Sequence, residues 1–172
     1  MRPTIICHMG TSIDGGLHPS RFTRPAAGVS AEALRRHYEA VHDRFEADGW
    51  IVGRVTMAEM AKGRERAVAV KSPLPREPHL GRRNVKKLLL EGGGTINGAF
   101  LKHRLIDEFS TLIYPAIDGL AGRQTIVDYD GADGERPGAG QSLRLIGCET
   151  LEGGMVWLRH RIEEAPASAP QG

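Results

Sequence analysis

The sequence contains few cysteines, little net charge and no long hydrophobic run. Its two cysteines, Cys7 and Cys148, lie far apart in apolar, strand-like contexts, so we expect reduced core thiols, and no cysteine or histidine pair has the spacing of a zinc site. The net charge of +2 is spread along 172 residues, which argues against nucleic acid as a partner. Because neither a bilayer-spanning stretch nor a signal-peptide core is present, we expect a cytoplasmic protein without membrane contact or bound metal.

The sequence instead alternates short apolar runs with amphipathic stretches, which is typical of an α/β protein. Residues 30–47 are predicted to form a helix, with Ser30 as its N-cap, and residues 96–106 a second one. The expected strands, of which the last two form an antiparallel hairpin, are 4–9, 50–52, 87–90, 107–115, 143–150 and 155–162. We expect one domain over residues 1–162, with a mostly parallel central sheet, and a disordered tail at 163–172.

The most informative motif is a run of glycines directly after the apolar segment Lys87–Leu90. Gly92, Gly93 and Gly94 have no Cβ, so the backbone there can turn sharply and approach a ligand closely. The N–H groups and the positive dipole end of the helix that follows would then suit a phosphate. The alternative is a tight strand-to-helix turn without a ligand.

A second junction of strand, glycine and helix occurs at Gly53. The apolar residues 50–52 predict a buried strand, and Thr56 and Glu59 have the spacing of a capping box, which predicts a helix beginning at Thr56. In open α/β folds ligands bind at the carboxyl ends of the strands. The two junctions together are therefore a more specific sign of a nucleotide-type ligand than either one alone.

The order and strand contexts of these motifs resemble the reductase domain of bacterial riboflavin biosynthesis, the RibD C-terminal domain, which has the dihydrofolate-reductase-like fold. The matching segments are 11–15, 53–56, 91–97, 105–108 and 115–119. The resemblance implies a three-layer α/β fold, with NADPH lying across the carboxyl ends of the strands, and a homodimer. It also implies NADPH-dependent reduction of a pyrimidine-class small molecule that carries a ribosylamino 5′-phosphate, whose ribosyl group becomes ribityl.

The resemblance assigns the cofactor to the two glycine junctions. Gly53, Arg54 and Thr56 would bind the cofactor's phosphates, with Arg54 next to the 2′-phosphate of NADPH. Gly92–Gly94, followed by Thr95, would hold the pyrophosphate at the N-terminus of a helix. Thr56 can serve in addition as the N-cap of its helix.

Reduction of a sugar imine requires an acid near the reacting carbon. By resemblance, the first candidate for this acid is Asp14 and the second is Glu91, while Thr11 and Ser12 would position the substrate. From the residues alone, a turn residue beside a glycine is the better explanation of Asp14, and the alternative for Glu91 is a carboxylate that caps a backbone N–H. Arg21 or Arg24 could meet a substrate phosphate.

The chain departs from the family in residues 61–84, which are rich in proline and charge and too short for the two strand–helix units normally found there. Either the protein lacks that segment or residues are missing from the sequence near 81–84, in which case the backbone should show a spatial break between Leu80 and Val85. The rival functions are reduction of dihydrofolate or another pterin, and nucleotide binding without catalysis.

Overall fold

The computed structural model describes residues 2–53, 57, 84–122 and 124–165. The predicted helix start at Thr56, the predicted break between Leu80 and Val85 and the final residues 166–172 lie outside these ranges.

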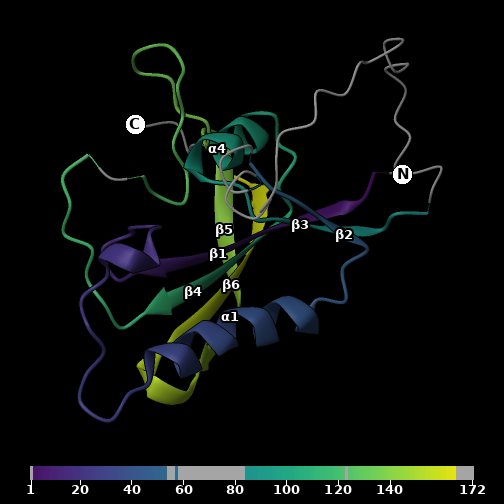
Figure 1. Cartoon of the computed structure of the whole chain (residues 1–172). Coiled ribbons are helices and arrows are strands. Elements are labelled where there is room, and N and C mark those ends of the chain that lie inside the picture. Colours follow the sequence, from purple (N-terminus) through teal and green to yellow (C-terminus); the bar gives the residue numbers. More distant parts are fainter. Residues whose placement is uncertain (1, 54–56, 58–83, 123, 166–172) are drawn as a thin grey trace, which may run out of the picture.

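Six described strands form one sheet in the order β2-β3-β1-β4-β6-β5 (Figure 1). Their bounds are Thr4–Ser12 for β1, Gly49–Ile51 for β2, Lys87–Leu90 for β3, Glu108–Tyr114 for β4, Gln141–Thr150 for β5 and Val156–Glu164 for β6. Strands β2, β3, β1 and β4 run parallel, whereas β6 lies antiparallel to both β4 and β5. The predicted mostly parallel sheet with a C-terminal antiparallel hairpin is therefore confirmed.

The hairpin extends further than predicted. Strand β6 continues to Glu164, where its partner strand is paired at Gln141, so Glu163 and Glu164 belong to the sheet and not to a tail. Cross-strand pairing supplies hydrogen bonds that the polar sequence of this segment does not reveal. The turn of the hairpin is the short 3₁₀ helix η2, Glu152–Gly154.

Among the described residues, one helix lies on each face of the sheet, which gives the three layers expected (Figure 1). Helix α1, Ala31–Arg44, begins as predicted at Ser30, whose hydroxyl oxygen accepts a 3.3 Å hydrogen bond from the N–H of Ala33. Helix α4, Gly94–Lys102, begins two residues earlier and ends four residues earlier than predicted. A short 3₁₀ helix, η1, spans Pro19–Arg21. None of the described helices has the length or the apolar content that crossing a bilayer requires.

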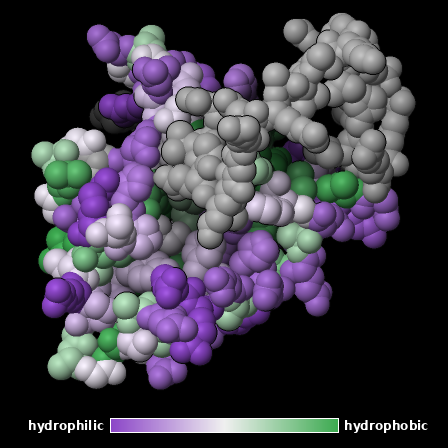
Figure 2. All heavy atoms as spheres, viewed as in Figure 1, coloured by the Kyte–Doolittle hydropathy of each residue, from purple (hydrophilic) through white to green (hydrophobic). Residues whose placement is uncertain are grey.

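Alternate residues of β1 enter the two cores on opposite faces of the sheet. Ile6 packs with Leu34 and Val41 of α1 and with Phe45 directly after it, whereas the neighbouring Cys7 packs in the cluster on the α4 side. The outer surface of α1 carries charged side chains, and hydrophilic residues accordingly predominate over this helix in Figure 2. The amphipathic pattern of the sequence thus fixes which side of α1 meets the sheet.

Two residues expected in the core lie at the edges of the described sheet. Trp50 is on β2 and is 48% exposed, so the strand predicted as buried is an edge strand of the described sheet. Cys148 is a free thiol as expected, but it is exposed on β5 and is not a core residue. An apolar run does not reveal how many neighbours its strand will have, and a strand at an edge is less covered than one in the centre.

Candidate active site

A cleft of about 880 Å³ lies at the carboxyl-end side of the parallel strands. Gly10 of β1 and Glu91, directly after β3, line its base, and Arg35 and Tyr38 line it from α1. The opposite wall is formed by Gly53, Gly92 and Gly93, with Thr95, Ile96 and Ala99 of α4. The loop around Leu17–Pro19 closes the remaining side. The cleft therefore lies where an open α/β fold binds its ligand.

The structure brings the two predicted glycine junctions together at this cleft. Strands β2 and β3 are parallel neighbours with Ile51 opposite Leu90, and the N–H of Glu91 donates a 2.9 Å hydrogen bond to the carbonyl of Ile51. A Cβ added to Gly53 would lie 3.7 Å from the amide nitrogen of Gly93. Arg54 and Thr56 lie outside the described residues, so the structure says nothing about their predicted roles.

The three consecutive glycines serve different purposes. A Cβ on Gly92 would collide with the side chain of Ile96, and a Cβ on Gly94 would collide with the carbonyl of Thr125 and the carboxylate of Asp128. A Cβ on Gly93 would meet no atom within 4 Å. Two of the glycines thus allow tight packing of the chain on itself, whereas Gly93, the N-cap of α4, borders open space where a ligand could approach the helix N-terminus.

Glu91 is the acidic side chain at the base of the cleft. Its side chain is only 11% exposed, and Oε1 accepts a 3.1 Å hydrogen bond from the Tyr38 hydroxyl, while His42 Nε2 lies 3.9 Å from the same oxygen. Burial raises the pKa of Glu91, and the nearby His42 and the Tyr38 hydrogen bond oppose that rise. A carboxyl in this setting holds a proton more readily than an exposed glutamate does.

Asp14, the first candidate for the acid, does not line the cleft. Its Oδ1 accepts hydrogen bonds from the Ser12 hydroxyl at 2.7 Å and from the Asp118 N–H at 3.0 Å, and its Oδ2 accepts one from the Gly119 N–H at 2.9 Å. These bonds, with that of Ser12 the strongest influence, hold the pKa of Asp14 well below its usual range. Asp14 therefore ties the loop after β1 to the loop after β4.

The other residues predicted to meet the substrate are engaged elsewhere. Thr11 and Ser12 are buried and do not line the cleft, and the Ser12 oxygen accepts a 2.8 Å hydrogen bond from the N–H of Gly16. Arg21 forms a two-pronged ion pair with Asp118, whose pKa it lowers. Arg24 does not line the cleft either.

Basic side chains do line the cleft, but from positions that the motifs did not single out. Arg35 lies on α1 and His18 on the loop before η1. A usable signal was present in the sequence: Arg35 is three residues before Tyr38, so helical spacing places both on adjacent parts of one face, next to the buried stripe of α1.

A mostly parallel central sheet with helices on both faces, and a cleft at the carboxyl ends of its parallel strands, places the described chain in the dihydrofolate-reductase-like class of α/β fold. Solved structures with this architecture support the assignment. A pyrimidine reductase-like protein from Corynebacterium diphtheriae has a TM-score of 0.66 at 14% identity, with 95% of this chain and 93% of that chain aligned. RibD from Acinetobacter baumannii has a TM-score of 0.62 at 16% identity, with 94% and 58% aligned.

The sequence comparisons agree with this fold. The family model of the RibD C-terminal domain matches residues 77–157. The 2,5-diamino-6-ribosylamino-4(3H)-pyrimidinone 5′-phosphate reductase of Aquifex aeolicus is 39% identical over 54 residues, which are 31% of this chain and 24% of that protein. The predicted resemblance to the RibD C-terminal domain is confirmed.

Proposed function

We propose that the protein is an NADPH-dependent reductase of a pyrimidine-class substrate, most similar to the enzymes that reduce 5-amino-6-(5-phosphoribosylamino)uracil in riboflavin biosynthesis. The observation that carries the proposal is the meeting of two glycine junctions and a buried carboxyl, Glu91, in one cleft. The matches to RibD-type reductases point to the same class of reaction.

The proposed cofactor site runs along the glycine wall of the cleft. Gly53, Gly92 and Gly93 present backbone without side chains, and the N–H groups at the start of α4, with Thr95 beside them, suit a pyrophosphate. Arg54 and Thr56 follow Gly53 in the chain and complete the proposed phosphate contacts, with Gly94 allowing the helix to pack. When bound there, NADPH would supply the hydride, and the protein would supply position and electrostatics.

Glu91 is the proposed proton donor. Opening of the sugar ring gives an imine, hydride adds to its carbon, and a proton must reach its nitrogen. Glu91 lies at the base of the cleft, and burial raises its pKa, so it holds that proton more readily than an exposed glutamate does. Arg35, which has no acidic partner among the described side chains, is a suitable contact for the substrate phosphate.

A homodimer in the cytoplasm is part of the proposal. Strand β5 forms one edge of the described sheet, and it exposes Leu143 and Leu145, which are 57% and 56% accessible. A long edge strand with exposed leucines is a surface that a second copy could cover. Both cysteines are free, as is usual for a protein of the reducing cytoplasm.

Cofactor binding can be tested by thermal unfolding with NADPH and with NADH. A ligand that binds only the folded protein raises the free energy of unfolding by about 2.7 kcal/mol when its concentration is one hundred times its dissociation constant. NADPH should raise the melting temperature more than NADH does at equal concentration, and the protein should then consume NADPH when given a ribosylaminopyrimidine 5′-phosphate. Consumption with dihydrofolate alone would identify a pterin reductase, and binding without any turnover would identify a nucleotide-binding protein.

A further inference from the structure

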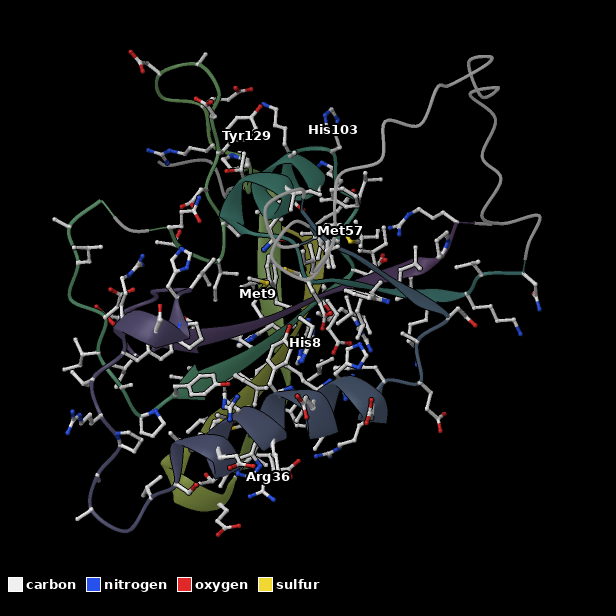
Figure 3. All side chains as sticks on the ribbon, viewed as in Figure 1. His8, Met9, Arg36, Met57, His103 and Tyr129 are labelled. Atoms are coloured by element: carbon white, nitrogen blue, oxygen red, sulfur yellow. The ribbon has the colours of Figure 1, made fainter. Side chains whose placement is uncertain are left out.

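A continuous buried network connects the core of the sheet to Glu91. It starts at Ser110 of β4, whose hydroxyl oxygen accepts a 2.8 Å hydrogen bond from Trp157 Nε1 and lies 2.9 Å from His8 Nδ1. Ser110 and His8 have no solvent exposure. Figure 3 shows His8 on the side of β1 that faces α1, with Met9 on the opposite side. The imidazole of His8 is thereby held in one orientation beneath α1.

Tyr38 of α1 packs on the imidazole of His8. Its ring stacks on the His8 imidazole with a centroid distance of 4.5 Å and an interplanar angle of 28°. Its hydroxyl lies 3.2 Å from the carbonyl oxygen of His8 and 3.1 Å from Oε1 of Glu91. Burial is the main cause of the raised pKa of Tyr38, so the phenol stays neutral and has one hydrogen to donate.

Both side-chain contacts of Glu91 within the described chain engage the same oxygen. Oε1 receives the Tyr38 hydroxyl and is the atom nearest His42, whereas no described donor bonds Oε2. Because Glu91 lines the cleft, a carboxyl that is fixed through Oε1 leaves Oε2 for the ligand. A hydrogen bond from Tyr38 also favours the ionised carboxylate over the neutral acid.

We propose that Tyr38 is the positioning residue of Glu91: its hydroxyl anchors Oε1, directs Oε2 to the substrate and stabilises the carboxylate that remains once the proton has been delivered. No covalent bond of Tyr38 changes during the reaction. One proton leaves Oε2 of Glu91 for the substrate nitrogen, and the phenolic hydrogen stays on Tyr38, where it is donated to Oε1 throughout. This inference rests on the proposed role of Glu91, but the geometry that it explains does not depend on the substrate.

Other charged or titratable groups face Glu91 and must stay constant in any test. On α1 these are His42 and, further along the cleft, Arg35 and Glu39; His8 lies on β1 beneath Tyr38, and Tyr114 of β4 and His18 of the loop before η1 also line the cleft. The described residues of β2 and α4 at the cleft add none. A substitution that removes only the Tyr38 hydroxyl leaves all of them in place.

The test is Tyr38→Phe, which keeps the ring stack on His8, with Tyr129→Phe as the matched control. Tyr129 lies in the loop before β5 and does not line the cleft. Protein labelled with ¹³C at the glutamate carboxyls is titrated by NMR without ligand, and Glu91→Gln assigns the Glu91 signal. The midpoint of Glu91 should rise by about one pH unit in Tyr38→Phe, since a hydrogen bond to the charged form is lost, and should not move in Tyr129→Phe.

An unchanged or lowered Glu91 midpoint in Tyr38→Phe would overturn the inference. Should that variant fail to fold, 3-fluorotyrosine can replace the tyrosines of the wild-type chain; its stronger O–H donor should lower the titration midpoint of Glu91, and no change would again overturn the inference.

In turnover, Tyr38→Phe should reduce kcat about tenfold at unchanged NADPH affinity. The basic limb of the pH profile of kcat should move to higher pH. A wild-type protein that reduces no pyrimidine would refute the proposed function, yet the ligand-free titration would still decide the role of Tyr38.

Discussion

At the scale of single residues, Asp14 and Glu91 show how surroundings set the proton affinity of a carboxyl. The carboxylate of Asp14 accepts hydrogen bonds from a hydroxyl and two backbone N–H groups, which stabilise its charged form. Glu91 is largely removed from water, which favours its neutral form. We therefore propose that Asp14 attaches the two loops to each other and that Glu91 donates the proton.

The two carboxyls can be separated by amide substitutions. Glu91→Gln should reduce kcat about a hundredfold or more while NADPH binding and the melting temperature stay close to those of the wild type, because only the proton donor is lost. Asp14→Asn should lower the melting temperature by a few degrees, because an NH₂ group replaces an acceptor, yet retain turnover per folded molecule. Steady-state kinetics and thermal unfolding of both variants check this, and the reverse pattern would show that Asp14 is the acid.

His8 makes folding stability dependent on pH. Burial lowers its pKa from the ordinary 6.5 to about 4. Between these two pH values His8 is therefore mostly protonated in the unfolded chain and mostly neutral in the folded protein. Stability should therefore fall as pH decreases from 7 to 5, by about 2 kcal/mol from His8 alone. The raised pKa of Glu91 acts in the opposite direction, so the effect must be isolated by comparison with a variant.

The comparison uses urea unfolding of the wild type and His8→Gln at both pH values. The variant should be less stable at pH 7, because packing under Tyr38 is lost, but its stability should depend less on pH. Equal pH dependence in the two proteins would contradict a neutral buried His8.

At the scale of elements, the junction of β3 with α4 combines a tight turn with a surface for a ligand. Gly94 is enclosed by the loop that carries Thr125 and Asp128, whose N–H donates a 3.0 Å hydrogen bond to the Gly94 carbonyl. Gly93 faces open space. Within one motif, Gly94 is therefore required by close packing of the chain, whereas Gly93 leaves room for a ligand.

Alanine substitutions distinguish these constraints. Gly94→Ala should destabilise the fold by about 1–3 kcal/mol, since the new methyl group overlaps backbone and carboxylate atoms. Gly93→Ala should fold with a loss of less than about 1 kcal/mol, because its φ of −64° suits alanine, but its affinity for NADPH should fall at least about tenfold. Urea unfolding and cofactor titration measure the two effects. Wild-type affinity in Gly93→Ala would place the cofactor elsewhere.

Local patterns predicted the helices and strands well, because caps and apolar spacing are encoded over a few residues. Ser30 caps α1 as expected, and Lys87–Leu90 is an interior strand. Burial at the edges was not predictable: Trp50 is exposed because β2 has a single described neighbour. The position of Glu91 in the cleft followed from the family motif, whereas that of Arg35 depended on how α1 lies across the sheet, which only the folded chain reveals.

At the scale of the whole molecule, the sheet is asymmetric, with parallel strands that carry the cleft and a hairpin that forms the opposite edge (Figure 1). Leu143 and Leu145 are exposed on that edge. The proposed dimer would bury this edge, and it would leave the cleft of each copy open.

The proposed dimer predicts a specific response to charge at this edge. Leu143→Lys combined with Leu145→Lys should convert the dimer to monomer, because lysines on an edge strand oppose pairing. Leu120→Lys, which replaces an equally exposed leucine in the loop after β4, should leave the dimer intact. Light scattering after size-exclusion chromatography reads out the mass. A wild-type monomer, or a dimer that survives the double substitution, would contradict this interface.

The central claim is that hydride passes from NADPH to a pyrimidine-linked sugar in this cleft. The most direct measurement supplies NADPH deuterated at the transferable position together with either 5-amino-6-(5-phosphoribosylamino)uracil or 2,5-diamino-6-ribosylamino-4(3H)-pyrimidinone 5′-phosphate, and determines the product by mass spectrometry. We predict a ribityl product with one deuterium on the former sugar carbonyl carbon, formed by the wild type and lost in Glu91→Gln. Bound NADPH with both pyrimidines returned unchanged would contradict the account.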